Sequence, residues 1–430
     1  MKPNRQSPLL SERRIVFLVG AVQFVNILDF VMVMPLGPDF AKSLGIASSK
    51  LGMIGGSYTA AAALSGLVGS FFLDRFDRRK ALAVAMAGLV LGTAAGGFGV
   101  GLFSLMGARV LAGLFGGPAT SISFSIIADV IPPERRGKAM GAVMGAFSVA
   151  SVFGVPAGLE LARRGGWRLP FFAVAGLGLC VAASALLLLP PLRIHLEGKI
   201  ENPPPRPGLR ELLSRRNVQL SYLMTAVVMI AGFLLIPNIS AYLQQNLGYP
   251  RERLGLLYMV GGLVSFFATR LGGVLVDRFG STRVGTFGAV ILICVLYVGF
   301  ASPVVWVPVL PFFVTFMFAL GFRNVSYNTL TSKVPRTGER ATFMSIQSSV
   351  QHLASAVGAF LSAHLLTESV DGKLVGVSRL AAASIALTAV LPVLLWRVER
   401  QVARPEVRSS AAQPHDSQTG INPSGPGLAR

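Results

Sequence analysis

Asp29 is the residue of this 430-residue chain best suited to carrying a proton. It lies inside a long apolar segment, 15–37, whereas the other acidic residues stand outside such segments or near their ends. A charge at bilayer depth costs at least about 2.5–3.5 kcal/mol, so a carboxylate there faces a cavity, has a partner or is protonated. Gln23 and Asn26 precede Asp29 at spacings of three and share a helical stripe with it. We expect Asp29 to alternate between protonated and ionised forms; the alternative is a structural hydrogen bond to a neighbouring helix.

Two arginines also stand inside apolar segments. Arg109 is a natural counter-charge for Asp29, and because guanidinium stays protonated it would tune the carboxyl rather than carry the proton. It lies only about one turn into its segment, so it could instead extend to the membrane surface. Arg323 lies deeper in its segment, where it could bind an anionic or polar group or pair with a helix end.

Polar side chains in the apolar segments are candidates for lining a binding cavity. Gln347 and Gln351 are four residues apart and therefore share one helical face. Asn26 and Tyr58 are further candidates, although each of these four side chains alone could simply bond to a neighbouring helix.

The sequence does not indicate an enzyme. No nucleophile–base pair, metal-ligating cluster or phosphate-binding Gly-x-x-x-x-Gly-Lys-[Ser/Thr] motif occurs in it, so we predict no catalytic residues, metal site or cofactor.

Long uncharged runs are the strongest structural signal of the chain. Hydrophobic residues make up 52% of it and charged residues only 13%, against about 25% charged residues in soluble domains. A membrane-spanning helix needs roughly 20 apolar residues. We therefore predict an all-α polytopic membrane protein with twelve transmembrane helices. The expected spans are 15–37, 51–73, 81–101, 104–128, 138–161, 168–189, 218–243, 254–276, 283–301, 305–331, 341–366 and 378–397.

The net charge of +20 is distributed unevenly between the two sides of this predicted topology. Most Lys and Arg residues fall on the side that also holds both chain ends, which the positive-inside rule assigns to the cytoplasm. The basic excess therefore indicates topology and contact with anionic lipid headgroups, and we expect no nucleic-acid partner.

An internal repeat divides the chain into two halves. Asp74-Arg75-Phe76 reappears as Asp277-Arg278-Phe279, 203 positions later. We expect six-helix bundles at 1–189 and 218–397, a Pro-rich cytoplasmic linker at 190–217 and a disordered cytoplasmic tail at 398–430. Two such repeats suit a transporter whose site lies between the halves near the midplane.

Several motifs together resemble the major facilitator superfamily, and within it the arabinose-efflux-permease-like branch of drug/proton antiporters. They cover about residues 15–397. The motifs are Ser70-x-x-x-Asp74-Arg75-x-Asp77-Arg78-Arg79, its second copy Gly273-x-x-x-Asp277-Arg278-x-Gly280, Arg109-x-x-x-Gly113 with Asp129-x-x-Pro132-Pro133-Glu134-Arg135-Arg136-Gly137, Gly154-Val155-Pro156-Ala157-Gly158, Gly166-Trp167-Arg168-Leu169-Pro170-Phe171, Phe343-Met344-Ser345 and Gln351-His352-Leu353.

The resemblance implies roles for the charged loops. Asp74 and Asp277 would contact the starts of expected helices 11 and 5, joining the halves when the cytoplasmic side closes. Arg78 would bridge to Asp129, and the same loops contain Arg75 and Arg278. These six residues form a predicted conformational switch.

The resemblance also implies proton handling by Arg109 and a role for expected helix 5. Gly154, Pro156 and Gly158 should kink that helix, in packing or in gating. The family's antiporter signature reads Gly-Pro-x-x-Gly-Gly, and Val155 interrupts it here.

We therefore predict a secondary active transporter that exports small organic molecules (drugs, sugars or metabolites) by proton-coupled alternating access. Asp29 and Arg109 would couple protons, and Asn26, Tyr58, Arg323, Gln347 and Gln351 would bind substrate. The expected location is the plasma membrane, the inner membrane of a bacterium, and the expected state is a monomer. Alternatives are a symporter or facilitator that imports a metabolite, and a non-transporting assembly or sensor protein.

Overall fold

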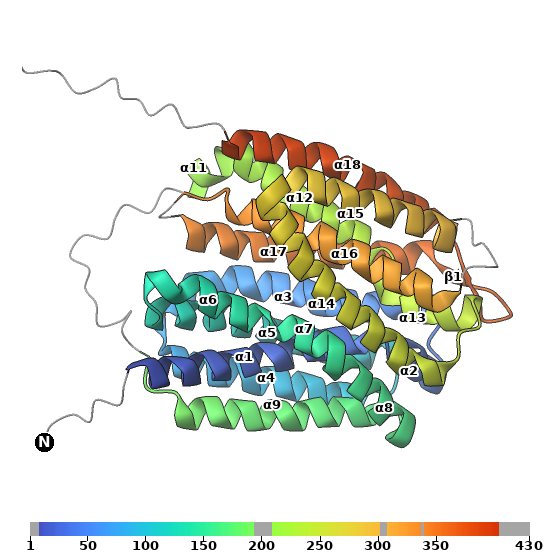
Figure 1. The fold of residues 1–430 in the computed structure, drawn as a ribbon. Helices are drawn as coiled ribbons and strands as arrows, with labels where there is room; N and C mark the ends of the chain where they lie inside the picture. The colour runs from blue at the N-terminus through green and yellow to red at the C-terminus, as the bar shows by residue number, and fades with distance from the viewer. Residues whose placement is uncertain (1–7, 193–208, 302–307, 337–338, 404–430) are drawn as a thin grey trace, which may run out of the picture.

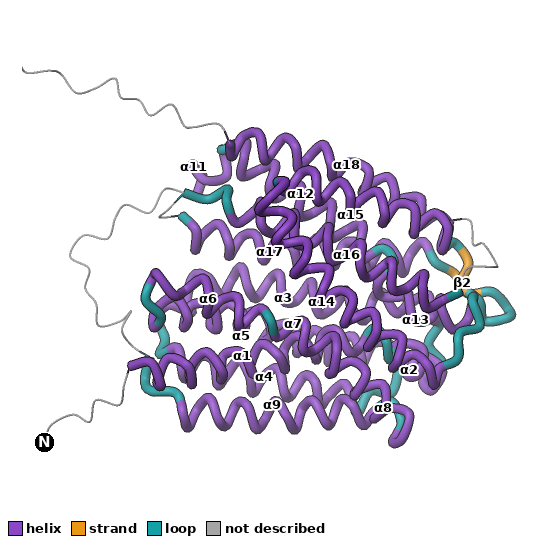
Figure 2. The backbone as a smooth tube through the Cα atoms, in the orientation of Figure 1, coloured by secondary structure: helices purple, strands orange, loops and turns teal. Residues whose placement is uncertain are grey.

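The protein is a bundle of long helices with one short β-hairpin, as seen in a computed structural model of the chain (Figure 1). The structure describes residues 8–192, 209–301, 308–336 and 339–403. Figure 2 shows how fully helix dominates these residues and how short the connecting loops are.

The first half of the chain forms one group of helices, drawn from blue to green in Figure 1. Its elements are α1 (Pro8–Val33), α2 (Gly37–Leu44), η1 (Ser48–Lys50), α3 (Leu51–Phe72), η2 (Leu73–Arg75), α4 (Arg78–Gly97), α5 (Leu102–Val130), α6 (Pro133–Met144), α7 (Ala146–Val149), η3 (Ala150–Gly154), α8 (Val155–Gly165) and α9 (Arg168–Leu188).

The second half forms a second group, which lies beside the first. Its elements are α11 (Leu209–Ser214), α12 (Arg216–Phe233), η4 (Ile236–Asn238), α13 (Ile239–Ala241), η5 (Tyr242–Asn246), η6 (Arg251–Arg253), α14 (Leu254–Phe279), α15 (Ser281–Leu296), η7 (Tyr297–Ala301), α16 (Val309–Ser332), α17 (Arg340–Leu365), β1 (Thr367–Glu368), β2 (Leu374–Val375) and α18 (Val377–Ala403). The antiparallel hairpin pairs Thr367 with Val375 and Glu368 with Leu374.

Close helix packing within each half depends on small residues, because lipid provides no hydrophobic drive between helices. Gly113 on α5 shows this most clearly. A Cβ at Gly113 would lie 2.3 Å from the carbonyl oxygen of Tyr58 on α3. Even alanine would therefore separate these two helices, which carry residues of the candidate site.

The two ends of the bundle differ. The start of α1, the end of α9, the start of α11 and the end of α18 lie at one end, which we call the linker side (Figure 1). The β-hairpin lies at the opposite end, which we call the hairpin side.

The halves contact each other at the hairpin side. Arg251 forms an ion pair with Asp39, with Nε 2.7 Å from Oδ1. The Glu368 carboxylate accepts a hydrogen bond from the Ser48 backbone N–H at 2.7 Å, and Gln245 donates to the Ser48 hydroxyl at 2.6 Å. These contacts hold the first half against the second at this end of the molecule.

The observed elements refine the predicted spans. Eleven helical segments of the described chain are long and apolar enough to cross a membrane. The one expected span missing from these eleven is 341–366. It corresponds to α17, which has 26 residues but contains Gln347, Gln351 and His352. These polar side chains lower its hydropathy, so α17 is not among the eleven.

Three other expectations needed adjustment. Expected helix 5 is not continuous: α6 and α7 precede the π-helical turn η3, and α8 follows it. The predicted linker contains the short helix α11, and α18 continues to Ala403, beyond the expected end at 397. The fold is also not purely helical, because β1 and β2 connect α17 to α18. The break expected near Ser302, between the spans 283–301 and 305–331, lies outside the described residues, as do most of the linker and the tail.

Candidate functional site

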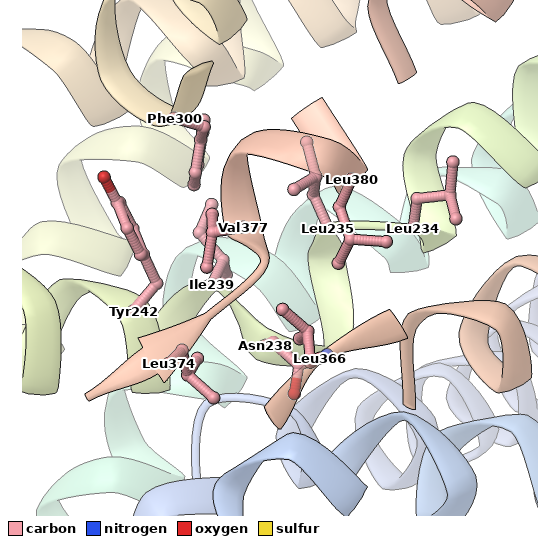
Figure 3. A pocket seen from close by; sticks show the side chains of 10 residues that line it. All are labelled: Leu234, Leu235, Asn238, Ile239, Tyr242, Phe300, Leu366, Leu374, Val377 and Leu380. Carbon is pink, nitrogen blue, oxygen red and sulfur yellow. The ribbon is translucent and has the colours of Figure 1, made fainter. Parts of the chain in front are cut away.

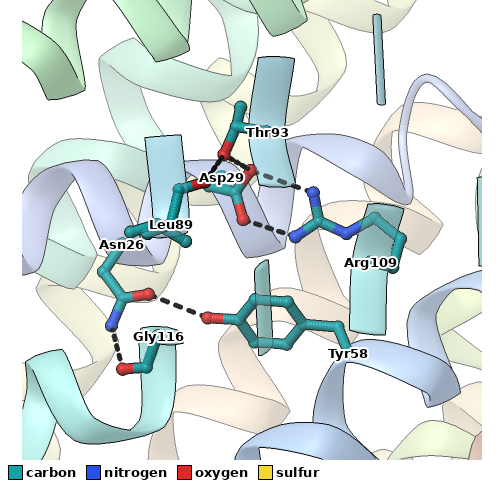
Figure 4. A network of polar contacts seen from close by, with 7 residues as sticks. All are labelled: Asn26, Asp29, Tyr58, Leu89, Thr93, Arg109 and Gly116. Atoms are coloured by element: carbon teal, nitrogen blue, oxygen red, sulfur yellow. Dashed lines mark hydrogen bonds and ion pairs between the residues drawn. The ribbon is translucent and has the colours of Figure 1, made fainter. Parts of the chain in front are cut away.

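Asp29 on α1 and Arg109 on α5 form a buried ion pair in the first half (Figure 4). Arg109 Nη1 donates to Asp29 Oδ1 at 2.9 Å, and Nη2 donates to Oδ2, so the contact is bidentate. Thr93 on α4 also donates to Asp29 Oδ1, at 2.7 Å. The exposed fraction is 0% for Asp29 and 1% for Arg109. Arg109 therefore does not extend to the membrane surface, which was one of the two sequence-based alternatives.

Tyr58 and Asn26 extend this cluster away from the ion pair. The Tyr58 hydroxyl donates to Asn26 Oδ1 at 2.8 Å. Asn26 Nδ2 in turn donates to the Gly116 carbonyl at 3.0 Å and to the Thr120 hydroxyl at 2.7 Å. The guanidinium of Arg109 lies 4.9 Å from the centroid of the Tyr58 ring, a cation–π contact. Side chains from α1, α3, α4 and α5 thus hold one polar network, as Figure 4 shows.

An aromatic stack leads from this network to the second half. The Phe30 ring lies 5.0 Å from that of Tyr58, between ring centroids. It also stacks on Phe233 of α12, at 6.1 Å. The sequence gives no sign of this bridge, because Phe30 and Phe233 come from different halves and phenylalanine is common throughout the chain.

Arg323 on α16 is buried in the second half, with an exposed fraction of 3%. Its Nε and Nη2 donate to the side-chain oxygen of the adjacent Asn324, at 3.2 and 3.1 Å. Within the described chain, Arg323 has no carboxylate partner. It therefore differs from Arg109, whose charge is neutralised by Asp29.

Gln347 and Gln351 lie on α17. Gln347 is buried and donates through Nε2 to the Thr225 hydroxyl on α12. Its Oε1 is also buried and has no hydrogen-bond partner among the described residues. Gln351 is half-buried. The Oε1 atom of Gln347 is thus free to accept a hydrogen bond as far as the described residues show. A substrate contact by either glutamine stays a prediction.

The linker-side charged loops are only partly paired. Arg78 is buried and its Nε lies 3.3 Å from Asp129 Oδ2, which is the contact predicted from the motif. Asp277 and Arg278 are exposed, and no described ion pair or hydrogen bond connects them to the first half. Arg75 is also exposed, and the side chain of Asp74 lies outside the part that the structure describes. The switching role of these loops stays a prediction.

Asp77 has a structural role that the sequence reading missed. Its carboxylate accepts the backbone N–H of Arg79 at 2.9 Å and so caps the start of α4. It also accepts the N–H of Leu192, after α9, at 3.3 Å. Asp is a preferred N-cap residue, so its place just before α4 is a sequence signal for this cap.

The glycines around Pro156 allow close contacts with α1. A Cβ at Gly154 would lie 2.6 Å from a Leu28 methyl carbon, and a Cβ at Gly158 would lie 2.9 Å from Met32 Sδ. The π-helical turn η3 ends just before Pro156, which stands in the first turn of α8, and a kink at this point stays a prediction. Packing accounts for these glycines, and a gating role stays a prediction.

A small pocket, separate from the residues above, lies in the second half (Figure 3). Asn238 is its polar residue: Nδ2 donates to Ser362 at 2.8 Å, and Oδ1 has no partner among the described residues. The lining residues are Leu234, Leu235, Asn238, Ile239, Tyr242, Phe300, Leu366, Leu374, Val377 and Leu380. In the described chain, no cluster of His, Cys, Asp or Glu is arranged to hold a metal ion.

Comparison with known proteins identifies the family of this fold. The sequence profile of the Major Facilitator Superfamily matches residues 19–359. The chain belongs to the Major Facilitator Superfamily. It is therefore a multi-pass membrane protein with a transporter fold rather than an enzyme, and this fold implies a small-molecule substrate.

Solved structures of transporters share the fold. A bacterial homologue of the human lysosomal transporter Spinster, in an inward-facing and occupied conformation, has a TM-score of 0.71 at 17% identity, over 93% of this chain and 98% of that one. A D-xylose–proton symporter has a TM-score of 0.70 at 18% identity, over 92% and 99%. The nucleoside transporter NupG has a TM-score of 0.66 at 12% identity, over 89% and 99%. At these identities the likeness shows the fold alone.

The Arg251–Asp39 pair allows a first test of the hairpin-side contacts in this superfamily member. Both side chains are 22% exposed, so we expect the pair to stabilise the closed hairpin side by only about 1 kcal/mol. Arg251→Asp should therefore lower the ratio of closed to open molecules about fivefold, and the exchange Asp39→Arg with Arg251→Asp should restore it. Distances between spin labels placed on the two halves would measure the change. An unaltered distance distribution in Arg251→Asp would show that this ion pair does not hold the hairpin side closed.

Proposed function

We propose that this Major Facilitator Superfamily member is a proton-coupled exporter of small organic molecules that works by alternating access. The observation that carries the proposal is the bidentate Asp29–Arg109 pair, buried and bordered by Tyr58. A buried ion pair is weak support for stability alone, because desolvation offsets most of the attraction between its charges. A titratable member of such a pair is better explained by function.

The pair can couple a proton to a movement of the helices. Protonation of Asp29 removes the negative charge that balances Arg109, and the guanidinium cannot release its own proton. The uncompensated cation then favours any arrangement of α1 and α5 that brings it water or another acceptor. Because Phe30 stacks on both Tyr58 and Phe233, a shift of α1 reaches the interface between the halves.

Alternating access requires two global states with different contacts. The ion pair and hydrogen bonds at the hairpin side, together with the exposed Asp277 and Arg278 at the linker side, support a state closed at the hairpin side. In the opposite state, the loops around Asp74 and Asp277 would join the halves. Substrate would contact Asn26, Tyr58, Arg323, Gln347 and Gln351 between these two events.

The remaining parts of the proposal follow from topology. The protein would have twelve transmembrane helices, with α17 as the eleventh, in two six-helix bundles at 1–189 and 218–397. Both termini would be cytoplasmic, so the linker side would face the cytoplasm. The protein would act as a monomer in the plasma membrane, the inner membrane of a bacterium. The motifs around Pro156 and Trp167 support the drug/proton antiporter branch.

Transport driven by a pH gradient should depend on the charge at Asp29. A growth-inhibition panel, with and without the protein, would first identify compounds that it exports. In membrane vesicles with an imposed pH gradient, Asp29→Asn should lower the transport of such a compound by at least about tenfold, in the range of a lost proton-transfer group. The double variant Asp29→Asn with Arg109→Gln provides a neutral pair that should be more stable than Asp29→Asn and is equally unable to bind the proton.

Two comparisons make this test decisive. Glu160→Gln, which removes an exposed acid on α8, should leave the pH-driven rate unchanged. Undiminished pH-driven transport in both Asp29 variants would remove Asp29 from the coupling. Movement of the compound in the same direction as the protons would indicate symport in place of export.

A further inference from the structure

Arg323 is a buried cation without a counter-charge among the residues that the structure describes. Its side chain is 97% withdrawn from solvent, with 3% exposed, and its hydrogen bonds to a described side chain go to the neutral Asn324. Burying an unpaired charge is costly. The first half neutralises its own buried arginine with Asp29, so the second half departs from the pattern that the same chain uses elsewhere.

Gly232 on α12 lies beside Arg323, at the position that corresponds to Asp29 in the internal repeat. It stands 203 positions after Asp29, which is also the spacing between the repeated Asp74 and Asp277. A Cβ at Gly232 would lie 3.6 Å from Arg323 Nη2 and 3.4 Å from Ile236 Cδ1. At the position where the first half carries its carboxylate, the second half has a glycine, which offers Arg323 no acid there.

Gly232 lies close to where the halves meet. It is partly exposed, whereas Arg323 beside it is buried. The next residue, Phe233, stacks on Phe30 of the first half. The same aromatic stack continues to Tyr58, beside the Asp29–Arg109 pair.

We propose that Arg323 binds an acidic group, a carboxylate or phosphate, of the transported molecule on the side of its guanidinium that faces Gly232. Guanidinium pairs with both oxyanions through two parallel N–H donors. The bound acid takes the place of the missing carboxylate, so substrate supplies to the second half the charge that Asp29 supplies to the first. The inference deepens the proposed function, on which it rests for naming the occupant as substrate.

Charge-selective labelling of a cysteine at position 232 tests the site without knowledge of the substrate. The exposed Cys180 and Cys294 are first replaced by serine in the full-length chain. The rates of Gly232→Cys with an anionic (2-sulfonatoethyl) and a cationic (2-trimethylammonioethyl) methanethiosulfonate are then measured in membranes, each relative to its rate with 2-mercaptoethanol. With Arg323 present, the anionic-to-cationic ratio should be about tenfold higher than in Arg323→Gln, and Arg323→Lys should retain most of the preference.

Gly66→Cys is a matched control on α3. Gly66 is also partly exposed and faces Ser349 of α17; a Cβ at Gly66 would lie 3.9 Å from Ser349 Oγ, with no described charged group within 4 Å. Its labelling ratio should not respond to Arg323→Gln. If Arg323→Gln fails to fold, the comparison of Gly232→Cys with Gly66→Cys in the presence of Arg323 carries the test. Equal ratios, or no reaction of Gly232→Cys with either reagent, would overturn the proposal.

An acid introduced beside Arg323 should compete with the substrate. Gly232→Asp should lower the inhibitory concentration of the exported compounds of the growth panel by at least about tenfold. Gly232→Ala, which adds the Cβ alone, should leave it unchanged. Those compounds should be acids. Export of neutral or cationic compounds that is indifferent to Gly232→Asp would overturn the inference and leave the proposed function standing. Anion-selective labelling of Gly232→Cys in a protein that exports nothing would support an anion site at Arg323 and overturn the proposed export.

Discussion

Asp29→Asn should destabilise the protein by about 3–5 kcal/mol, the cost of removing one partner of a buried ion pair. Arg109 would remain buried at 1% exposure, with Tyr58 beside it and no carboxylate to balance its charge. The double variant Asp29→Asn with Arg109→Gln should recover most of this loss, because two neutral amides of similar size can replace the pair. Unfolding of the purified protein in detergent by a denaturant titration would measure the three free energies.

Arg109→Gln should differ from Asp29→Asn in its dependence on pH. An orphaned carboxylate can take up a proton and become neutral, whereas an orphaned guanidinium stays charged. A neutral carboxyl leaves no unbalanced charge in the folded Arg109→Gln variant, so its loss of stability should shrink as the pH falls. In Asp29→Asn the loss should be the same at pH 5 and pH 8.

The surface pair of Glu160 and Arg163 provides the comparison. Both residues lie on α8 and are half-exposed or more, so Arg163→Gln should have little effect on stability at either pH. If Asp29→Asn were as mild as Arg163→Gln, or if Arg109→Gln lost stability as the pH fell, the ion pair would not hold the charge balance that the coupling mechanism needs.

Much of this fold could be predicted from the sequence because its strongest signals are local. Uncharged runs locate the helices, and the repeat of Asp74-Arg75-Phe76 at Asp277 divides the chain into halves. The end of α18 and the π-helical turn η3 were missed for a physical reason. Helix ends and extra residues in a turn depend on packing between helices, which composition does not record.

The candidate site was predictable in its residue types but not in its contacts. Asp29 and Arg109 stood out because charge is costly in an apolar segment, yet their pairing across 80 positions needed the structure to decide it against surface exposure. The bond from Tyr58 to Asn26 and the cap made by Asp77 involve common polar residues, which have many possible partners. Arg323 next to Gly232 became informative only when the two positions were seen together.

Gly52→Ala should open the hairpin side of the molecule. Gly52 on α3 faces α17, and a Cβ there would lie 2.3 Å from the carbonyl oxygen of Ala359. Because that atom belongs to the backbone, the two helices would have to separate by about 1 Å to reach a normal contact distance. Overpacking of this kind costs about 1–3 kcal/mol, and each 1.4 kcal/mol lowers the ratio of closed to open molecules about tenfold.

The opening should be visible as a longer distance between the halves. Lys42 on α2 and Lys373 in the hairpin are both exposed and lie on different halves, so spin labels at these positions report on the hairpin side. Transport should fall in parallel, because an exporter that rarely closes at the hairpin side cannot take up its substrate from the linker side. The folded state itself should remain, since the clash lies between the halves and not within either one.

Gly113→Ala separates this effect from simple destabilisation. Its Cβ would also lie 2.3 Å from a backbone oxygen, that of Tyr58, but both helices belong to the first half. It should therefore lower the free energy of unfolding without lengthening the distance between labels at 42 and 373. If Gly52→Ala instead behaved like Gly113→Ala, losing stability at an unchanged distance, the contact between α3 and α17 would be part of a fixed core, and the halves would not move apart there.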